Sequence, residues 1–192
     1  LGLVGSEMCI RDRMHLAEAF LGTLAVRDDA DTQGALDALV EAMQRRFVDL
    51  EHGVMLEKPL DAVDNWSEPG HQFEWFYLLA SSACLRGTPL YRSLETAFAH
   101  AEAQGVDQTT GAVAAMLEVN GSVKDGTQRI WAQAEYLRAL TLRPESEHLL
   151  ARQLTALQTQ FLHPTGWNEC LDSQGQISRS DMPSTTPYLS LI

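Results

Sequence analysis

Two histidines in the sequence each stand three residues before a glutamate. His15 and Glu18 lie in the stretch MHLAEA, and His71 and Glu74 lie in EPGHQFEW. On a helix, residues three apart share a face, so each imidazole can lie beside a carboxylate that orients the ring and tunes its pKa. A histidine held in this way can take up or release a proton near neutral pH. The two pairs therefore predict general acid/base chemistry, with a helix-surface ion pair as the alternative for either pair alone.

The second pair has a particular place in its expected helix. Pro69 suits the first turn of a helix, so His71 is expected near the helix N-terminus. The positive end of the helix dipole favours the neutral imidazole, which can both give and take protons during enolisation. No two histidines or cysteines have zinc-finger spacing, so we expect no metal. Enolisation also needs no redox cofactor, because histidine and neighbouring donors can stabilise an enediolate.

A third segment carries a tryptophan and a glutamate four residues apart. Trp131 and Glu135, in RIWAQAEYLRAL, share a helical face. An indole face can stack on a sugar ring while a carboxylate accepts hydrogen bonds from the sugar hydroxyls. The alternative is that Trp131 belongs to the core and Glu135 is a surface charge.

The helices that must position these residues recur in a repeat of about 56 residues. Apolar residues spaced by three and four form three pairs of helical patterns. Each pair is followed by a stretch, opening at Gly53, Gly111 or Gly166, that is typical of a short strand or β-hairpin, and the last two stretches contain polar-Gly turns at Asn120-Gly121 and Gln174-Gly175. The expected helices are 14–27 with 33–50, 71–86 with 88–104, and 127–143 with 145–162.

Three repeated units of helix, loop, helix and hairpin predict an all-α fold built of helical hairpins. The hairpins can close into a ring, as an α/α toroid, or stack as an open array of the scaffold type. The His, Trp and Glu residues that begin one helix in each unit favour the closed barrel. A scaffold has no need of such residues at equivalent places.

Charge and cysteine usage restrict the partners. The 192-residue chain has a net charge of −12, which argues against a nucleic acid or an anionic membrane, because both select clustered Lys and Arg. No apolar run approaches the roughly 20 residues that cross a bilayer. The cysteines Cys9, Cys84 and Cys170 form no CxxC pair, as is typical of a reducing compartment, so we expect a cytoplasmic protein. A homodimer is left open.

The two ends of the sequence differ from the rest. Residues 1–13, LGLVGSEMCIRDR, resemble a translated sequencing-adapter artefact, and the helical pattern begins abruptly at Met14. Residues 189–192, LSLI, resemble the start of a second artefact. We therefore expect a non-native leader at 1–13, a partial barrel domain at 14–188 and a non-native tail at 189–192.

The motifs resemble those of the N-acylglucosamine 2-epimerase and mannose isomerase family. MHLAEAFL is similar to the family's MHLLEA, and EPGHQFEWFYLL to its EPGHxxEWxWLL. RIWAQAEYLRAL is similar to RxWPQTExxxAL, with Ala132 and Ala134 in place of Pro and Thr. GWNECLDSQGQ, followed by MPSTTPY, is similar to the stretch that leads to the family's closing Pro-Tyr-His. The matches occur in order over about 14–188, and EPGHQFEW is the most specific.

The resemblance implies the C-terminal half of an (α/α)6 barrel with a sugar isomerase or 2-epimerase activity. Such an enzyme acts through a cis-enediol on a monosaccharide or small disaccharide, and mannose–fructose isomerisation is the first choice here. By resemblance, His71 and His15 are catalytic, and Glu74 supports His71. The residues implied to contact the sugar are Trp131, Glu135, Arg129 and Trp75.

The resemblance also predicts what this chain lacks. The family's last catalytic histidine should follow Tyr188, where this chain has Leu189. About three of the six expected hairpins are present. The 192-residue chain alone is therefore expected to expose apolar surface and to be inactive.

Two other functions remain open from the residues. A glycoside hydrolase on an α/α barrel needs two carboxylates about 5–9.5 Å apart, and Glu74 and Glu135 could take those roles. That assignment leaves the paired histidines unexplained. A non-catalytic helical-repeat binding module would make His71 and Glu74 dispensable.

Overall fold

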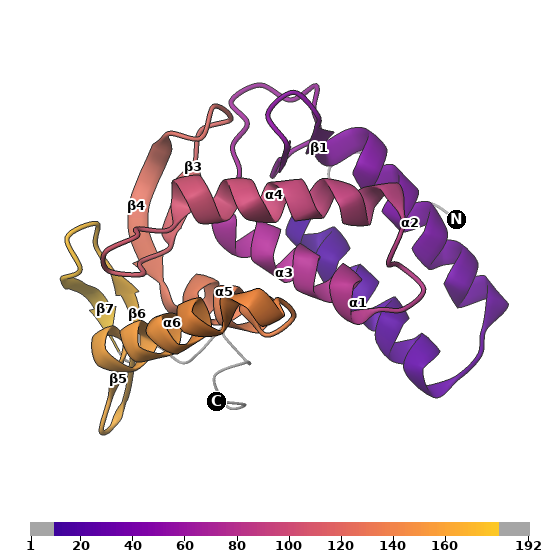
Figure 1. The fold of residues 1–192 in the computed structure, drawn as a ribbon. Coiled ribbons are helices and arrows are strands. Elements are labelled where there is room, and N and C mark those ends of the chain that lie inside the picture. The colour runs from indigo at the N-terminus through magenta and orange to yellow at the C-terminus, as the bar shows by residue number, and fades with distance from the viewer. Residues whose placement is uncertain (1–9, 181–192) are drawn as a thin grey trace.

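The computed structural model describes residues 10–180, and its helices form three hairpins in chain order (Figure 1). This arrangement confirms the expected all-α architecture, with each helix boundary within about five residues of its expected place. The hairpins are α1 (Ile10–Val26) with α2 (Ala30–Phe47), α3 (Pro69–Ser81) with α4 (Pro89–Gly105), and α5 (Ile130–Leu140) with α6 (Glu147–Gln160), which the short 3-10 helix η1 (Pro144–Ser146) precedes.

The first helix begins at Ile10, ahead of the expected start at Met14. Ile10 is buried, and its amide donates to the carbonyl of Glu57 at 3.3 Å. Arg13 is also buried, with its guanidinium 5.1 Å from the centre of the Phe47 ring. Residues 10–13 therefore continue α1, and the foreign origin of residues 1–13 stays a prediction. Residues 1–9 and the expected tail at 189–192 lie outside the described residues.

The odd-numbered helices form one layer of the molecule, here called the inner layer. Helix α3 packs against α1 on one side and α5 on the other. Helices α2 and α4 pack against each other outside this layer, and α4 crosses in front of α3 in Figure 1. The starts of the three inner helices therefore come together, as the repeat predicts for His15, His71 and Trp131.

Short antiparallel strands connect the hairpins. Strands β1 (Val48–Asp49) and β2 (Val54–Met55) form one pair. A second sheet has the order β3-β4-β6-β5, with β7 beside β6. The expected turns at Asn120-Gly121 and Gln174-Gly175 are present, and both glycines have left-handed φ angles, +89° and +76°. The second sheet consists of β3 (Ala114–Leu117), β4 (Val123–Arg129), β5 (Leu162–His163), β6 (Gly166–Leu171) and β7 (Ile177–Ser180).

The boundary between β4 and α5 differs from the expected one. The sequence pattern predicts a helix from residue 127, whereas α5 begins at Ile130. Gln128 and Arg129 instead pair with Leu171 and Cys170 of β6. Strand pairing across the sheet thus overrides the local helical pattern and places Arg129 at the edge of the inner layer.

Proline and a capping threonine define two helix starts. Pro89 follows Thr88, whose Oγ1 accepts a hydrogen bond from the amide of Tyr91 at 3.2 Å. Pro69 stands at the same position in α3, after Glu68, which confirms its expected place in the first turn. His71 therefore lies at the N-terminus of α3.

Aromatic side chains fill the space between α3, α4 and α5. The Phe73 ring lies 4.5 Å from Tyr136 and 5.2 Å from Phe98, and Phe98 lies 4.9 Å from Phe76. Such contacts stabilise a core beyond the area they bury. They hold α3 rigidly against α5.

Among residues 10–180, no helix is both long and apolar enough to cross a membrane.

Candidate active site

The first turn of α3 brings the most specific sequence motif against α5. A Cβ atom at Gly70 would lie 2.6 Å from ring carbons of Trp131 and 2.9 Å from the Cβ of Ala132. Glycine therefore lets the two helices approach closely. The neighbouring His71 ring lies 5.0 Å from the Trp131 ring, tilted by 37°. The indole thus forms one wall beside the imidazole.

The hydrogen-bond partner of His71 is Glu57, in the loop after β2. Nδ1 of His71 lies 3.0 and 2.9 Å from the two carboxylate oxygens of Glu57, and 3.7 Å from a carboxylate oxygen of Glu68. The expectation that Glu74 supports His71 is therefore wrong as a hydrogen bond. Side chains on a helix lean toward its N-terminus, so a ring in the first turn reaches back to the preceding loop.

The expected neutral state of His71 is also wrong. Burial of the ring lowers its pKa, but the charge and hydrogen bond of Glu57, with the charges of Glu68 and Glu74, raise the pKa of His71 to about 9. Burial in turn raises the pKa of Glu57. Both shifts keep a proton between Nδ1 and the carboxylate at neutral pH. A buried carboxylate in contact thus outweighs the helix dipole.

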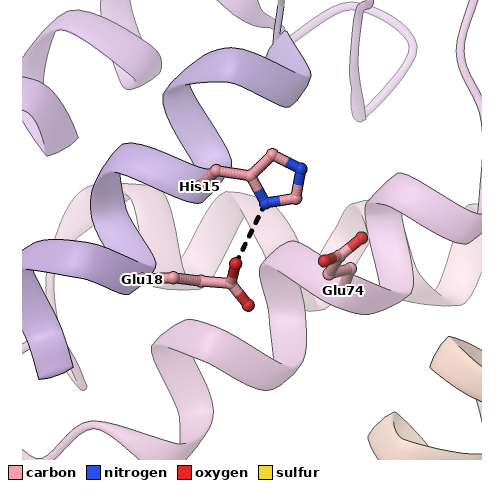
Figure 2. A group of neighbouring side chains, drawn as sticks. All are labelled: His15, Glu18 and Glu74. Carbon is pink, nitrogen blue, oxygen red and sulfur yellow. Dashed lines mark hydrogen bonds and ion pairs between the residues drawn. The ribbon is translucent and has the colours of Figure 1, made fainter. Parts of the chain in front are cut away.

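The first histidine pair is present on α1, as its spacing predicts. Nδ1 of His15 lies 3.0 Å from Oε2 of Glu18. Figure 2 shows the Glu74 carboxylate on α3 across from this pair. The ligand atoms of His15, Glu18 and Glu74 all lie within 4.8 Å of one another. Glu74, the glutamate of the second pair, therefore lies beside both residues of the first pair.

The carboxyl of Glu74 is buried, and its Oε1 has no hydrogen-bond partner within residues 10–180. Burial and the charge of Glu135 raise the pKa of Glu74 to about 8, although the charge of His71 opposes the shift. Near neutral pH the group therefore holds a proton and can donate a hydrogen bond. An unpaired buried oxygen is costly, so a polar ligand group at this place would stabilise it.

Glu135 is buried on α5, which excludes the alternative that it is a surface charge. Both of its oxygens accept from Nη1 of Arg138, at 2.9 and 2.8 Å. Burial raises the pKa of Glu135 to about 7, against the lowering effect of Arg138. Glu74 and Glu135 thus form a pair of weak acids on neighbouring helices.

Arg129 lies at the edge of this cluster. Its guanidinium is 5.9 Å from the centre of the Trp131 ring, and its Nη2 is 3.8 Å from Oε1 of Glu169. Glu169 is fully buried, and neither of its carboxylate oxygens has a hydrogen bond in the described part of the chain. Trp131 itself is half-buried, so part of its face is accessible.

The expected sugar contact of Trp75 is not supported. Its side chain has no exposed surface and belongs to the apolar core between the helices. Because α3 is covered by α1, α4 and α5, even the position four residues after His71 is enclosed. Trp75 therefore contributes to packing.

Within residues 10–180, two groups of side chains have the donor atoms for a divalent cation. One is His15, Glu18 and Glu74, and the other is Glu57, Glu68 and His71. Nitrogen and carboxylate donors of this kind suit zinc or manganese. The expectation of a metal-free site stays a prediction.

Glu57 is the residue that the sequence reasoning missed. It lies in GVMLEKPL, the stretch that opens at Gly53, whose pattern predicts a strand and no chemistry. A glutamate that directly follows the apolar run Val54–Leu56 is a signal of burial, because charged groups are rarely buried without a partner. The position expected to carry the last histidine, after Tyr188, lies outside the described residues.

Three helical hairpins, with carboxylates on every inner helix and histidines on two of them, define an α/α-barrel protein of the class that includes sugar isomerases and epimerases. The model of the N-acylglucosamine 2-epimerase (GlcNAc 2-epimerase) family matches residues 6–186. The chain belongs to this family. Its fold is that of the C-terminal half of an (α/α)6 barrel, as the sequence resemblance implies.

One sequence relative agrees with the family, and two solved structures agree with the fold. The mannose-6-phosphate isomerase of Rhizobium meliloti (strain 1021) is 30% identical over 199 residues, covering 91% of this chain and 51% of that protein. A D-mannose isomerase structure matches with a TM-score of 0.72 at 15% identity, over 90% of this chain and 51% of its own. The cellobiose 2-epimerase of Bacillus thermoamylovorans B4167 matches with a TM-score of 0.80 at 18% identity, over 98% of this chain and 53% of its own. The chain thus spans about half the length of these proteins.

Proposed function

We propose that the protein interconverts an aldose with its ketose or its 2-epimer, with mannose–fructose isomerisation as the first choice. The observation that carries this proposal is the buried imidazole of His71, which faces an accessible indole and lies among weak acids. Such a site can hold a neutral sugar and move protons at its carbons. No other part of residues 10–180 combines these groups.

In this mechanism a base removes the proton from C2 of the open-chain aldose and leaves a cis-enediol. A proton returned to C1 gives the ketose, and a proton returned to C2 gives the epimer. His71 in its neutral form takes this proton at Nε2 and returns it as the imidazolium, and His15 with Glu18 acts at the sugar oxygens. Glu74 supplies a hydrogen bond to a hydroxyl through its unpaired oxygen, and Trp131 and Glu135 hold the ring.

The charges favour an unphosphorylated sugar. Carboxyl groups dominate the cluster, and Arg138 on α5 already bonds Glu135. Arg129 lies between Trp131 and Glu169. Both guanidinium groups already lie beside a carboxylate, with which a phosphate dianion would have to compete. Mannose is therefore preferred to mannose 6-phosphate, although one relative bears the latter name.

A panel of sugars tests the proposal with the complete product of the gene that encodes this chain. The protein is incubated with D-mannose, mannose 6-phosphate, N-acetylmannosamine and cellobiose, and the products are identified by NMR. Fructose from mannose supports the isomerase, and a 2-epimer supports the epimerase. Glucose released from cellobiose with uptake of water supports the hydrolase. Absence of any conversion, with sugar-dependent stabilisation, supports the binding module.

We expect the 192-residue chain alone to be inactive, because it spans about half the length of its relatives. The same panel, run with the chain and with the complete gene product, tests this. Equal turnover by the two proteins would contradict the expectation.

A further inference from the structure

Glu57 is held in place by its backbone as well as by His71. Its amide donates to the carbonyl of Trp66 at 2.9 Å, and its carbonyl accepts from the amide of Ile10 at 3.3 Å. Only 7% of its side chain is exposed. The loop between β2 and α3 and the first turn of α1 therefore fix where the carboxylate lies.

The helix that carries His71 also holds the strand that leads to Glu57. Oε1 of Gln72 accepts from the amide of Met55 at 3.0 Å, and its Nε2 donates to the carbonyl of Met55 at 2.8 Å. Gln72 is buried, so both bonds are shielded from water. Because Gln72 is adjacent to His71 and Met55 is two residues before Glu57, this amide pair fixes the distance between the imidazole and the carboxylate.

We propose that Glu57 is the positioning residue of His71, and that it keeps the proton on Nδ1 so that Nε2 exchanges protons with the substrate. A carboxylate accepts hydrogen bonds, so its contact with Nδ1 keeps hydrogen on that nitrogen in both the charged and the neutral ring, and the proton that is gained or lost is the one on Nε2. Among residues 10–180, Nε2 of His71 has no hydrogen-bond partner. Trp131 fixes the tilt of the ring from its other side.

This inference rests on the proposed function, since it assigns the nitrogen that acts on the sugar. It differs from the pairing read from the sequence, in which Glu74 orients the ring. Glu74 then remains free to contact the substrate. Carboxylates that orient a catalytic imidazole act without becoming acids or bases themselves.

The test compares Glu57→Gln with Glu68→Gln in the complete gene product. Both changes remove one negative charge near Nδ1, but only the first removes the hydrogen-bonded carboxylate. We expect Glu57→Gln to lower kcat about 10- to 100-fold with KM changed less than about twofold. Glu68→Gln should lower kcat less than about threefold. The exposed Glu118→Gln serves as the unrelated control.

A second measurement does not depend on turnover. In wild-type protein labelled with ¹⁵N-histidine, the His71 signals are assigned by their loss in His71→Gln. We expect a protonated Nδ1 that is hydrogen-bonded to the Glu57 carboxylate in the wild type, and a weaker hydrogen bond at Nδ1 in Glu57→Gln. An unprotonated Nδ1 in the wild type would overturn the proposal, as would unchanged kcat in folded Glu57→Gln. If no sugar is converted, the proposed function fails, while the ¹⁵N signals still decide the pairing.

Discussion

The two His-x-x-Glu motifs have the same spacing and lie in different surroundings. On α1 the side chain of His15 is 55% exposed and bonds the glutamate that its motif supplies. On α3 the side chain of His71 is 7% exposed and bonds Glu57, which its motif does not contain. Spacing thus determines which groups can meet, whereas burial and the neighbouring loop determine which pairing forms and what it does to the proton.

The position of each helix explains the contrast. Helix α3 lies between α1 and α5 under α4, so nearly all of its surface is enclosed. Helix α1 has α3 on one side only, so water competes for the His15 pair. A buried ion pair responds strongly to the loss of one partner, and an exposed pair responds weakly.

The two motifs should differ most in how much the loss of their histidine lowers kcat. His71→Ala should lower kcat about 10²- to 10⁴-fold, because it removes the proton-transfer group itself. His15→Ala should lower kcat by about tenfold, because an exposed histidine at the sugar oxygens is partly replaced by water. Both are measured by initial rates of sugar conversion.

His148→Ala is the control for this pair, since His148 is exposed on the outer helix α6. Its rate should match that of the wild type. A greater loss for His15→Ala than for His71→Ala would reverse the comparison and make the α1 histidine the principal acid/base.

Two glycines test how tightly α3 and α1 are packed. Gly70→Ala should lower the free energy of unfolding by about 1–3 kcal/mol, because the new methyl would overlap Trp131 and Ala132. Gly22→Ala, in α1, meets no atom within 4 Å and should raise it by about 0.5–1 kcal/mol. Urea denaturation of the complete gene product measures both, and equal effects would contradict the close contact of α3 with α5.

The pH dependence of the free energy of unfolding tests whether the buried carboxyl of Glu74 is protonated in the folded protein. The pKa of Glu74 is raised from 4.5 to about 8, so the folded state binds a proton that the unfolded chain has lost in this window. The free energy of unfolding should therefore fall as pH rises between these values. Glu74→Gln should remove part of this fall and be about 1–2 kcal/mol more stable than the wild type at alkaline pH.

Denaturation series at acid, neutral and alkaline pH give this comparison. Some decline should remain in Glu74→Gln, because the raised pKa values of His71 and Glu135 act in the same direction. A wild type whose stability does not change with pH would show that Glu74 is ionised at low cost.

The smallest effect is expected for the stability of the exposed pair. His15→Gln should change the free energy of unfolding by less than about 0.5 kcal/mol, because exposed ion pairs contribute little. Thermal melts are sufficient to detect a larger change. A loss above about 2 kcal/mol would mean that His15 is buried in the complete protein.

Local patterns predicted the helices and turns well, because they depend on nearby residues. Apolar spacing located all three hairpins, and the polar-Gly pairs at Asn120-Gly121 and Gln174-Gly175 marked two turns. The start of α5 was misplaced because Gln128 and Arg129 pair with a strand some 40 residues later, about which the local pattern carries no information.

The sequence predicts most of the residues that form the site, but it does not predict which of them contact each other. His71, Glu74 and Trp131 were identified from motifs, and the structure brings their helices together. The bond between His71 and Glu57 depends on a loop folding back over a helix start, which helical periodicity does not describe. Trp75 was misassigned because periodicity does not distinguish a helix with one buried face from a helix enclosed on all sides.

The central claim is that His71 moves the proton at C2 of a sugar. The most direct test incubates the complete gene product with D-mannose in D₂O and follows C1 and C2 by NMR, beside His71→Ala and His148→Ala. The account predicts fructose with deuterium incorporated by the wild type and by His148→Ala, and neither product nor exchange above background with His71→Ala. Deuterium incorporation that persists in folded His71→Ala would contradict it.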